Sequence, residues 1–189
     1  MKRSIRTVLA TSAALALTGL GVAPAAATAE PPKQDEAKYV KVDERSTFPA
    51  GYACKDEIKV HEKFKYRFTV LKENKHRAKY KEELHDGWAK FYNPKTHKWV
   101  VIPIHETAYI HENRKNATAV TKAHGKGYLQ GKGIKGIVAW KGDIKVKVSK
   151  LDDLDNVRFD IKSIHGHSKQ LCYKLGSKPV WGKNIPQPE

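Results

Sequence analysis

The sequence contains nine histidines, which are the best candidates for metal ligands in it. Two of them lie in the segment His165-Gly166-His167. Two histidines one residue apart on a β-strand point to the same face and can chelate a metal ion. The intervening glycine is typical of a turn instead, and a third ligand would have to come from a distant residue such as His105 or His111. Because nothing in the spacing places that ligand, the sequence predicts solvated histidines and no metal or other cofactor.

Acidic residues give no catalytic arrangement either. The segment with Asp152, Asp153 and Asp155 resembles a calcium-binding loop, but it lacks the glycine and the distal glutamate that such loops require. Glu82 and Glu83 are neighbours on a predicted strand, so they point to opposite faces and cannot act together on one substrate bond. We therefore predict no catalytic residue. The alternative is a small extracellular hydrolase, or a metal-dependent enzyme built from scattered histidines.

Residues 131–136 read GKGIKG, which fits the dinucleotide-binding pattern G-x-G-x-x-G. That pattern holds a phosphate only where it follows a strand and begins a helix. Here residues 137–140 and then residues 144–149 (IKVKVS) are strand-forming sequences. The glycines are therefore predicted to bend the chain between strands rather than to bind a nucleotide.

The most informative feature is a basic hairpin at residues 63–83. Aromatic residues alternate with cations in its first half, which predicts a strand whose aromatic face is buried. A three-residue loop at residues 72–74 keeps the cations of both strands on the outer face, with Arg67 opposite Lys79 and Leu71 opposite Lys75. The predicted outer face carries Lys63, Lys65, Arg67, Lys75, Arg77, Lys79 and Lys81.

Seven cations on one face favour a negatively charged partner, because like charges opposite each other on paired strands are destabilising. Across the chain, 36 Lys and Arg residues outnumber 20 Asp and Glu residues, for a formal net charge of +16. Lysine is a point charge that attracts polyanions without the paired contacts by which arginine reads bases. We therefore expect binding to anionic cell-envelope polymers or other extracellular polyanions, without specific nucleic-acid readout. A surface kept basic for solubility is the alternative.

The first 29 residues have the pattern of a cleaved signal peptide. A basic segment at residues 2–6 precedes an apolar, uncharged stretch, and residues 27–29 form a small-x-small cleavage signal. A membrane anchor is the alternative, but the apolar run is short and no basic stop signal follows it. We expect a secreted monomer with no membrane span in its mature form. In that oxidising compartment Cys54 and Cys172 are expected to form a disulfide.

The sequence predicts a single β domain at residues 39–181, between a polar leader (30–38) and a proline-bearing tail (182–189). Apolar and polar residues alternate in segments such as IKVKVS, which is the pattern of half-buried antiparallel strands. Turn-forming residues separate these segments, and residues 168–174 suggest one short helix near the C-terminus. We therefore expect an all-β fold, an antiparallel β-sandwich or flattened barrel of about nine to eleven strands.

Five segments, taken in order, resemble a large group of uncharacterised secreted actinobacterial proteins. They are RSTFPAGYACKDEIKV, FTVLKENKHRAKYK, WAKFYNPKTHKWVVI, WKGDIKVKV and NVRFDIKSIHGHSKQLCYKLG, and the resemblance covers roughly residues 43 to 175. In the third segment, His97 stands where the turn of that group usually has glycine. The resemblance implies a secreted β-sandwich-like domain with one disulfide. It transfers no activity and no catalytic residue.

Overall fold

The computed structural model describes residues 38–153 and 156–182, which form seven β-strands and one short α-helix. All seven strands belong to one antiparallel sheet, and each strand pairs with the next along the chain. A 3-10 turn, η3 (Arg114–Asn116), joins the fourth and fifth strands. The strands are β1 (Val40–Phe48), β2 (Ile58–Glu73), β3 (Arg77–Tyr92), β4 (Trp99–Asn113), β5 (Thr118–Leu129), β6 (Val138–Ser149) and β7 (Arg158–Gln170), and the helix is α1 (Leu171–Lys174).

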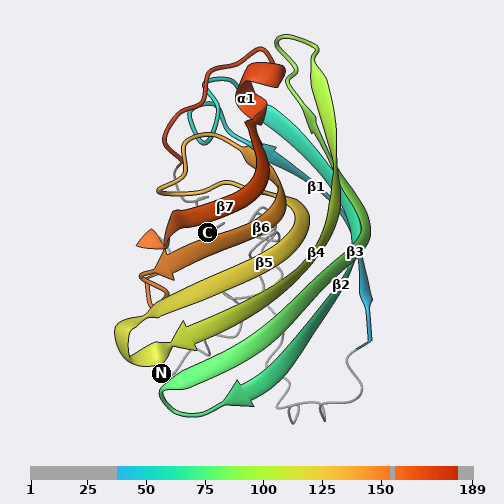
Figure 1. The fold of residues 1–189 in the computed structure, drawn as a ribbon. Helices are drawn as coiled ribbons and strands as arrows, with labels where there is room; N and C mark the ends of the chain where they lie inside the picture. The colour runs from blue at the N-terminus through green and yellow to red at the C-terminus, as the bar shows by residue number, and fades with distance from the viewer. Residues whose placement is uncertain (1–37, 154–155, 183–189) are drawn as a thin grey trace, which may run out of the picture.

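The sheet is strongly curled, so it has a concave inner face and a convex outer face (Figure 1). Alternation determines which side chains lie inside. On β4, Ile102, Ile104 and Ile110 are buried, whereas Pro103 and Tyr109 at alternate positions are exposed. The buried apolar side chains form two clusters, one that includes Phe91 and the disulfide and another that includes Phe159. The core therefore occupies the inner face, and most of the charged side chains are left on the outer face.

Three glycines allow the sheet to bend along one line across β5, β6 and β7. Gly125 pairs with Gly142, and Gly142 pairs with Gly166. Their φ angles are +134°, +121° and +128°, values that residues with a side chain rarely adopt. A Cβ atom on Gly142 would lie 2.2 Å from the carbonyl oxygen of His165. The two strands therefore approach this closely because glycine is present.

Gly142→Ala is expected to lower the free energy of unfolding by about 3 kcal/mol, because the added methyl group would meet the backbone of a paired strand. Gly51→Ala is the matched control, since Gly51 also has a positive φ (+77°) but its Cβ would meet nothing within 4 Å. The control is expected to cost about 1 kcal/mol. Urea unfolding measures both values. Equal losses would mean that the φ angle alone, and not the close approach of the strands, requires glycine at position 142.

The predicted all-β fold, its antiparallel strands and its short helix near the C-terminus are confirmed. The predicted nine to eleven strands in a sandwich or flattened barrel are not confirmed, because the described residues form seven strands in one open sheet. The difference lies in strand length, since β2 and β3 each run for 16 residues. Glycines and irregularities such as the register shift between Leu84 and Gly87 bend these strands without ending them.

Cys54 and Cys172 form the predicted disulfide, with a Cα–Cα distance of 5.6 Å. The bond joins the loop after β1 to α1, and both residues are buried in the core. Within the described residues, no helix is long and apolar enough to cross a membrane. The expected signal peptide (1–29) lies outside the described residues, as do the polar leader except Lys38 and the tail except Gly182.

The GKGIKG segment connects β5 to β6, and a strand follows it. Ile134 N–H donates to the carbonyl oxygen of Gly131, so the glycines form a turn as predicted. His97 also has a positive φ, +56°, a conformation in which glycine is favoured. Of the three acidic residues near position 153, Asp155 lies outside the described residues, and Asp153 N–H donates to Lys150 in a turn.

Candidate polyanion-binding face

The basic hairpin has a different register from the one predicted. Its loop consists of residues 74–76, with Glu73 opposite Ala78, so the predicted loop at residues 72–74 is wrong. Asn74 fixes the loop, because its side-chain oxygen accepts hydrogen bonds from the backbone N–H groups of His76 and Arg77, both at 2.9 Å. Two register shifts along β2 then move the strands relative to each other.

The observed register gives the cations different neighbours. Arg67 lies opposite Glu83 instead of Lys79, and Lys79 lies opposite Lys72. Arg67 and Lys81 both pair with Glu83, at 2.6 and 2.9 Å. Burial by itself raises the pKa of Glu83, but the hydrogen bonds from Lys81 and Arg67 outweigh it and hold that pKa below its usual value. Part of the predicted binding face therefore neutralises a carboxylate of the protein itself.

Lys63 and Lys65 are also paired, with Asp43 at 2.7 Å and with Asp86 at 2.8 Å. Exposed pairs such as these contribute about 0–1 kcal/mol to stability, and they reduce the charge offered to a ligand. Four of the seven predicted residues are thus in ion pairs. The other three, Lys75, Arg77 and Lys79, have no ion-pair partner in the described part of the chain.

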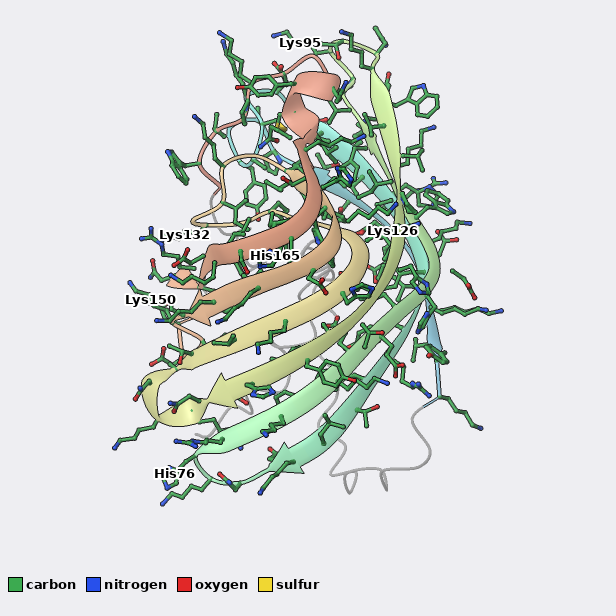
Figure 2. All side chains as sticks on the ribbon, viewed as in Figure 1. His76, Lys95, Lys126, Lys132, Lys150 and His165 are labelled. Carbon is green, nitrogen blue, oxygen red and sulfur yellow. A yellow bond between two sulfur atoms is a disulfide. The ribbon has the colours of Figure 1, made fainter. Side chains whose placement is uncertain are left out.

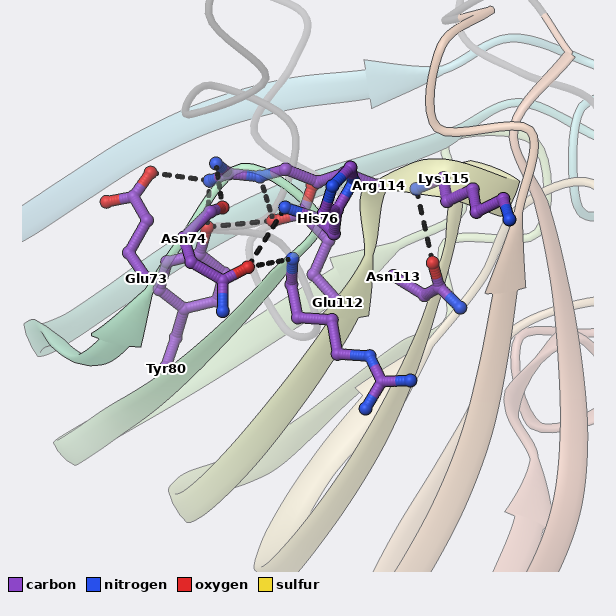
Figure 3. Close-up of polar contacts among 9 residues, drawn as sticks. Glu73, Asn74, His76, Tyr80, Glu112, Asn113, Arg114 and Lys115 are labelled. Carbon is purple, nitrogen blue, oxygen red and sulfur yellow. Dashed lines mark hydrogen bonds and ion pairs between the residues drawn. The ribbon is translucent and has the colours of Figure 1, made fainter.

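Arg114 clamps the tip of the hairpin to the connection between β4 and β5 (Figure 3). Its guanidinium group donates to Glu73 at 2.5 Å, to the carbonyl oxygen of Asn74 at 3.1 Å and to Tyr80 at 3.1 Å. It also contacts Glu112 at 3.3 Å. Because its donors are used within the protein, Arg114 positions the tip rather than a ligand. The exposed cations around this clamp are Lys72, Lys75, Arg77, Lys79 and Lys115.

Four lysines and one histidine from five strands form a line across the outer face, which we call the basic stripe. Lys72 lies opposite Lys79, Lys79 lies opposite His111, and Lys122 lies opposite Lys145. Lys122 is two residues from the partner of His111 on β5, so the two are diagonal neighbours at about 7–8 Å. Within the described residues, no carboxylate lies in ion-pair distance of these five side chains. The stripe therefore carries repulsion that an anionic ligand would relieve.

The environment of His111 reflects the density of this charge. Burial is the larger cause that lowers its pKa, and the charges of Lys79 and Lys122 lower it further. These two lysines come from strands on either side of β4. The neutral form of His111 is therefore favoured between these two lysines. A polyanion bound there would favour its protonated form.

The stripe ends in a groove of about 440 Å³ on the outer side of β4 to β7. Lys122 and Lys145 line it together with His124, Asp143 and His165. His124 Nδ1 lies 2.8 Å from an Asp143 oxygen, and Asp143 is opposite His165 in the sheet. The groove thus presents lysines, imidazoles and one carboxylate to the solvent.

The histidines considered as metal ligands do not converge. His105 contacts His85, with 3.3 Å between their Nδ1 atoms, and His111 lies in the basic stripe. His165 lies in the groove. No group of three His, Cys, Asp or Glu residues that could hold a metal ion occurs in residues 38–153 and 156–182.

The inner face carries four buried glutamates that the sequence analysis did not identify as a group. Glu62 accepts a hydrogen bond from Tyr128 at 2.8 Å, and burial raises its pKa to about 7. Burial, together with the charge of Glu82, holds the pKa of Glu106 well above its usual value. The alternation that places Phe64 inside also places Glu62 inside, so this pattern could have identified Glu62 as a buried residue. The buried set is Glu62, Glu82, Glu106 and Glu112.

Comparison of the chain with protein-family models, with curated proteins and with solved structures finds no match. The geometry of the outer face must therefore indicate the function. It combines paired cations on β2 and β3, a hairpin tip fixed by Arg114, and a stripe of cations without carboxylate partners. Lys122 and Lys145 became part of this site through strand register, which alternation alone does not specify.

Proposed function

We propose that this chain is a secreted, non-catalytic β domain that binds polyanions through the basic stripe. The observation that carries the proposal is a contrast on one surface. Lys63, Lys65, Arg67 and Lys81 are bound to carboxylates of the protein, whereas the lysines of the stripe face one another. A row of like charges is destabilising unless something binds to it.

The chemistry of the stripe suits a repetitive anionic polymer. Each lysine that neutralises a phosphate or carboxylate releases condensed counterions, which gives binding that depends strongly on salt. Lysine lacks the planar fork that recognises one anion geometry, so the stripe is suited to a class of polymers rather than to a sequence. Anionic cell-envelope polymers and other extracellular polyanions fit this description. The disulfide agrees with such a compartment, since disulfides persist in oxidising environments.

The proposal is tested by measuring binding to long-chain inorganic polyphosphate. In the stripe variant, Lys72, Lys79, Lys122 and Lys145 are all replaced with serine. Four lost contacts are expected to weaken binding on the order of a hundredfold at about 0.15 M salt. Fluorescence anisotropy of labelled polyphosphate measures the affinity.

A control variant removes the same number of charges from lysines that are already paired. Lys63, Lys65, Lys95 and Lys162 contact Asp43, Asp86, Asp56 and Asp160, and the control replaces these four lysines with serine. This paired-lysine variant is expected to lose less than about tenfold in affinity, because each of these lysines is bound to a carboxylate of the protein and offers less charge to a ligand. Equal losses in the two variants would show that net charge alone causes binding and that the stripe is no site.

The groove supports a second candidate function, a hydrolase that uses His124 as general base. The supporting observation is the 2.8 Å contact between His124 and Asp143, because a carboxylate can orient a histidine for proton transfer. Solvent exposure argues against it, since the two side chains are 77% and 64% exposed and water weakens such a pair. Turnover of bis(p-nitrophenyl) phosphate that disappears in His124→Ala would establish this second function.

A further inference from the structure

A second exposed surface lies at the other end of the outer face, on the hairpin of β3 and β4. Tyr92 is opposite Trp99, and Trp88 is opposite Pro103. Trp99 is 60% exposed and Val101 is 46% exposed, although both are large and apolar. We call Trp88, Tyr92, Trp99, Val101 and Pro103 the aromatic patch.

Packing of the fold does not explain this patch. The core occupies the opposite face, where Ala89, Phe91 and Ile102 are buried. The pairing of β5 with β4 begins only at His105, so in the described chain residues 99–104 have a strand neighbour on one side alone. An exposed group of large apolar side chains next to such an edge is a mark of an interaction surface.

Two basic side chains contact the rings of the patch. Lys90 Nζ lies 5.3 Å from the centroid of the Trp99 ring, and the His61 ring meets the Trp88 ring edge-on at 5.0 Å. Asp43, the carboxylate beside them, is already bound to His61 and to Lys63. The patch therefore combines aromatic faces with cations and carries no net acidic character.

We propose that the aromatic patch stacks the bases of a single-stranded nucleic acid whose phosphates are bound by the basic stripe. The inference rests on the proposed polyanion-binding function and specifies its ligand class. Proteins that bind single strands without sequence preference combine a cationic track with aromatic side chains, and each stacked base contributes about 1–3 kcal/mol. Bases suit the patch better than saccharides do, because sugar hydroxyl groups also need acceptor oxygens. Lys90 and His61 lie beside Trp99 and Trp88, and the nearby carboxylate of Asp43 is already bound to His61 and Lys63.

One strand connects the two surfaces. The outer positions of β4 run from Trp99 through His105 and Tyr109 to His111 in the stripe, a path of about 40 Å. Figure 2 shows Lys95, next to the patch, and His76, at the tip of the basic hairpin, at opposite ends of the molecule. A polymer that reaches both surfaces must therefore lie along the sheet, and a short oligonucleotide cannot contact both.

The experiment compares a thymidine oligonucleotide of about 20 residues with inorganic polyphosphate of matched charge. Trp99→Ala is expected to weaken oligonucleotide binding about tenfold, the loss of one stacked base, and to leave polyphosphate binding unchanged. Trp99→Phe keeps an aromatic face and is expected to retain most of the affinity. Because the Trp99 side chain is mainly exposed, its replacement should leave the thermal midpoint unchanged. The stripe variant is expected to weaken both ligands.

The possible negative results distinguish the stacking inference from the proposed polyanion binding. If the wild-type chain binds polyphosphate and Trp99→Ala does not change oligonucleotide affinity, the stacking inference is overturned and polyanion binding stands. If Trp99→Ala weakens both ligands equally, the ring has no role specific to bases, and the inference is again overturned. Hyaluronan, a ring-bearing polymer of carboxylates, is the third probe. Binding of hyaluronan that depends on Trp99, without such dependence for the oligonucleotide, would assign the patch to saccharides instead.

Discussion

Replacement of both Cys54 and Cys172 with alanine is expected to lower the free energy of unfolding by about 4–5 kcal/mol. The disulfide closes a loop with a sequence separation of 118 residues, and closing so long a loop removes much of the entropy of the unfolded chain. The bond also joins two segments that do not pair within the sheet, the loop after β1 and α1. Urea unfolding of the oxidised protein and of the double variant measures the difference.

Two further results bear on this expectation. Thiol titration of the unfolded, unreduced protein should find no free thiol, and two reactive thiols would contradict the disulfide directly. Reduction of the wild-type protein should reproduce the loss of stability seen in the double variant. A double variant as stable as the oxidised protein would mean that the sheet holds both ends of the chain without the covalent bond.

Glu62→Gln is expected to stabilise the protein by about 3 kcal/mol at pH 8. Burial raises the pKa of Glu62 to about 7 in the folded state, from an ordinary value of 4.5. The folded protein therefore binds this proton more tightly than the unfolded chain does. The stability that the protonated carboxyl group contributes is fully present below pH 4.5 and is lost as pH rises through about 7. Glutamine keeps an oxygen that can accept the hydrogen bond from Tyr128 but carries no charge to bury.

The measurement is the free energy of unfolding between pH 4.5 and pH 8 for both proteins. The wild-type protein should lose stability across this range, and Glu62→Gln should lose less. Glu44→Gln is a matched control, because Glu44 lies directly opposite Glu62 in the sheet but is less buried. An identical pH profile for the wild type and Glu62→Gln would show that ionisation of Glu62 does not cause the loss of stability at high pH.

The sequence was sufficient for features that depend on local pattern. Alternation in β2 assigned Phe64 to the inner face and Lys63 to the outer face, as the structure shows. Two cysteines in a chain with an export pattern were sufficient for the disulfide. Glycine positions likewise indicated the turn between β5 and β6, because their chemistry is local.

Register was not predictable, because it depends on bulges that alternation does not reveal. The loop at residues 74–76, in place of residues 72–74, removes Lys79 from Arg67 and places it against Lys72. The shift between Val70 and Lys72 then moves the pairs beyond it by one residue, which alters the site that the cations form. The convergence of Lys122 and Lys145 likewise depends on how two distant segments align. The burial of Glu62 was not predicted for a different reason. Alternation places position 62 on the inner face, but a carboxylate is costly to bury.

The salt dependence of polyphosphate binding tests the central claim most directly, because its slope counts the contacts that release counterions. On a plot of log affinity against log salt concentration, the stripe variant is expected to have a slope smaller in magnitude by about 3 than the wild type, from four lost contacts with a flexible polymer. The paired-lysine variant should change the slope by less than about 1, although its net charge is the same. Equal changes of slope in the two variants would contradict a binding site at the stripe and would leave a basic surface that serves solubility.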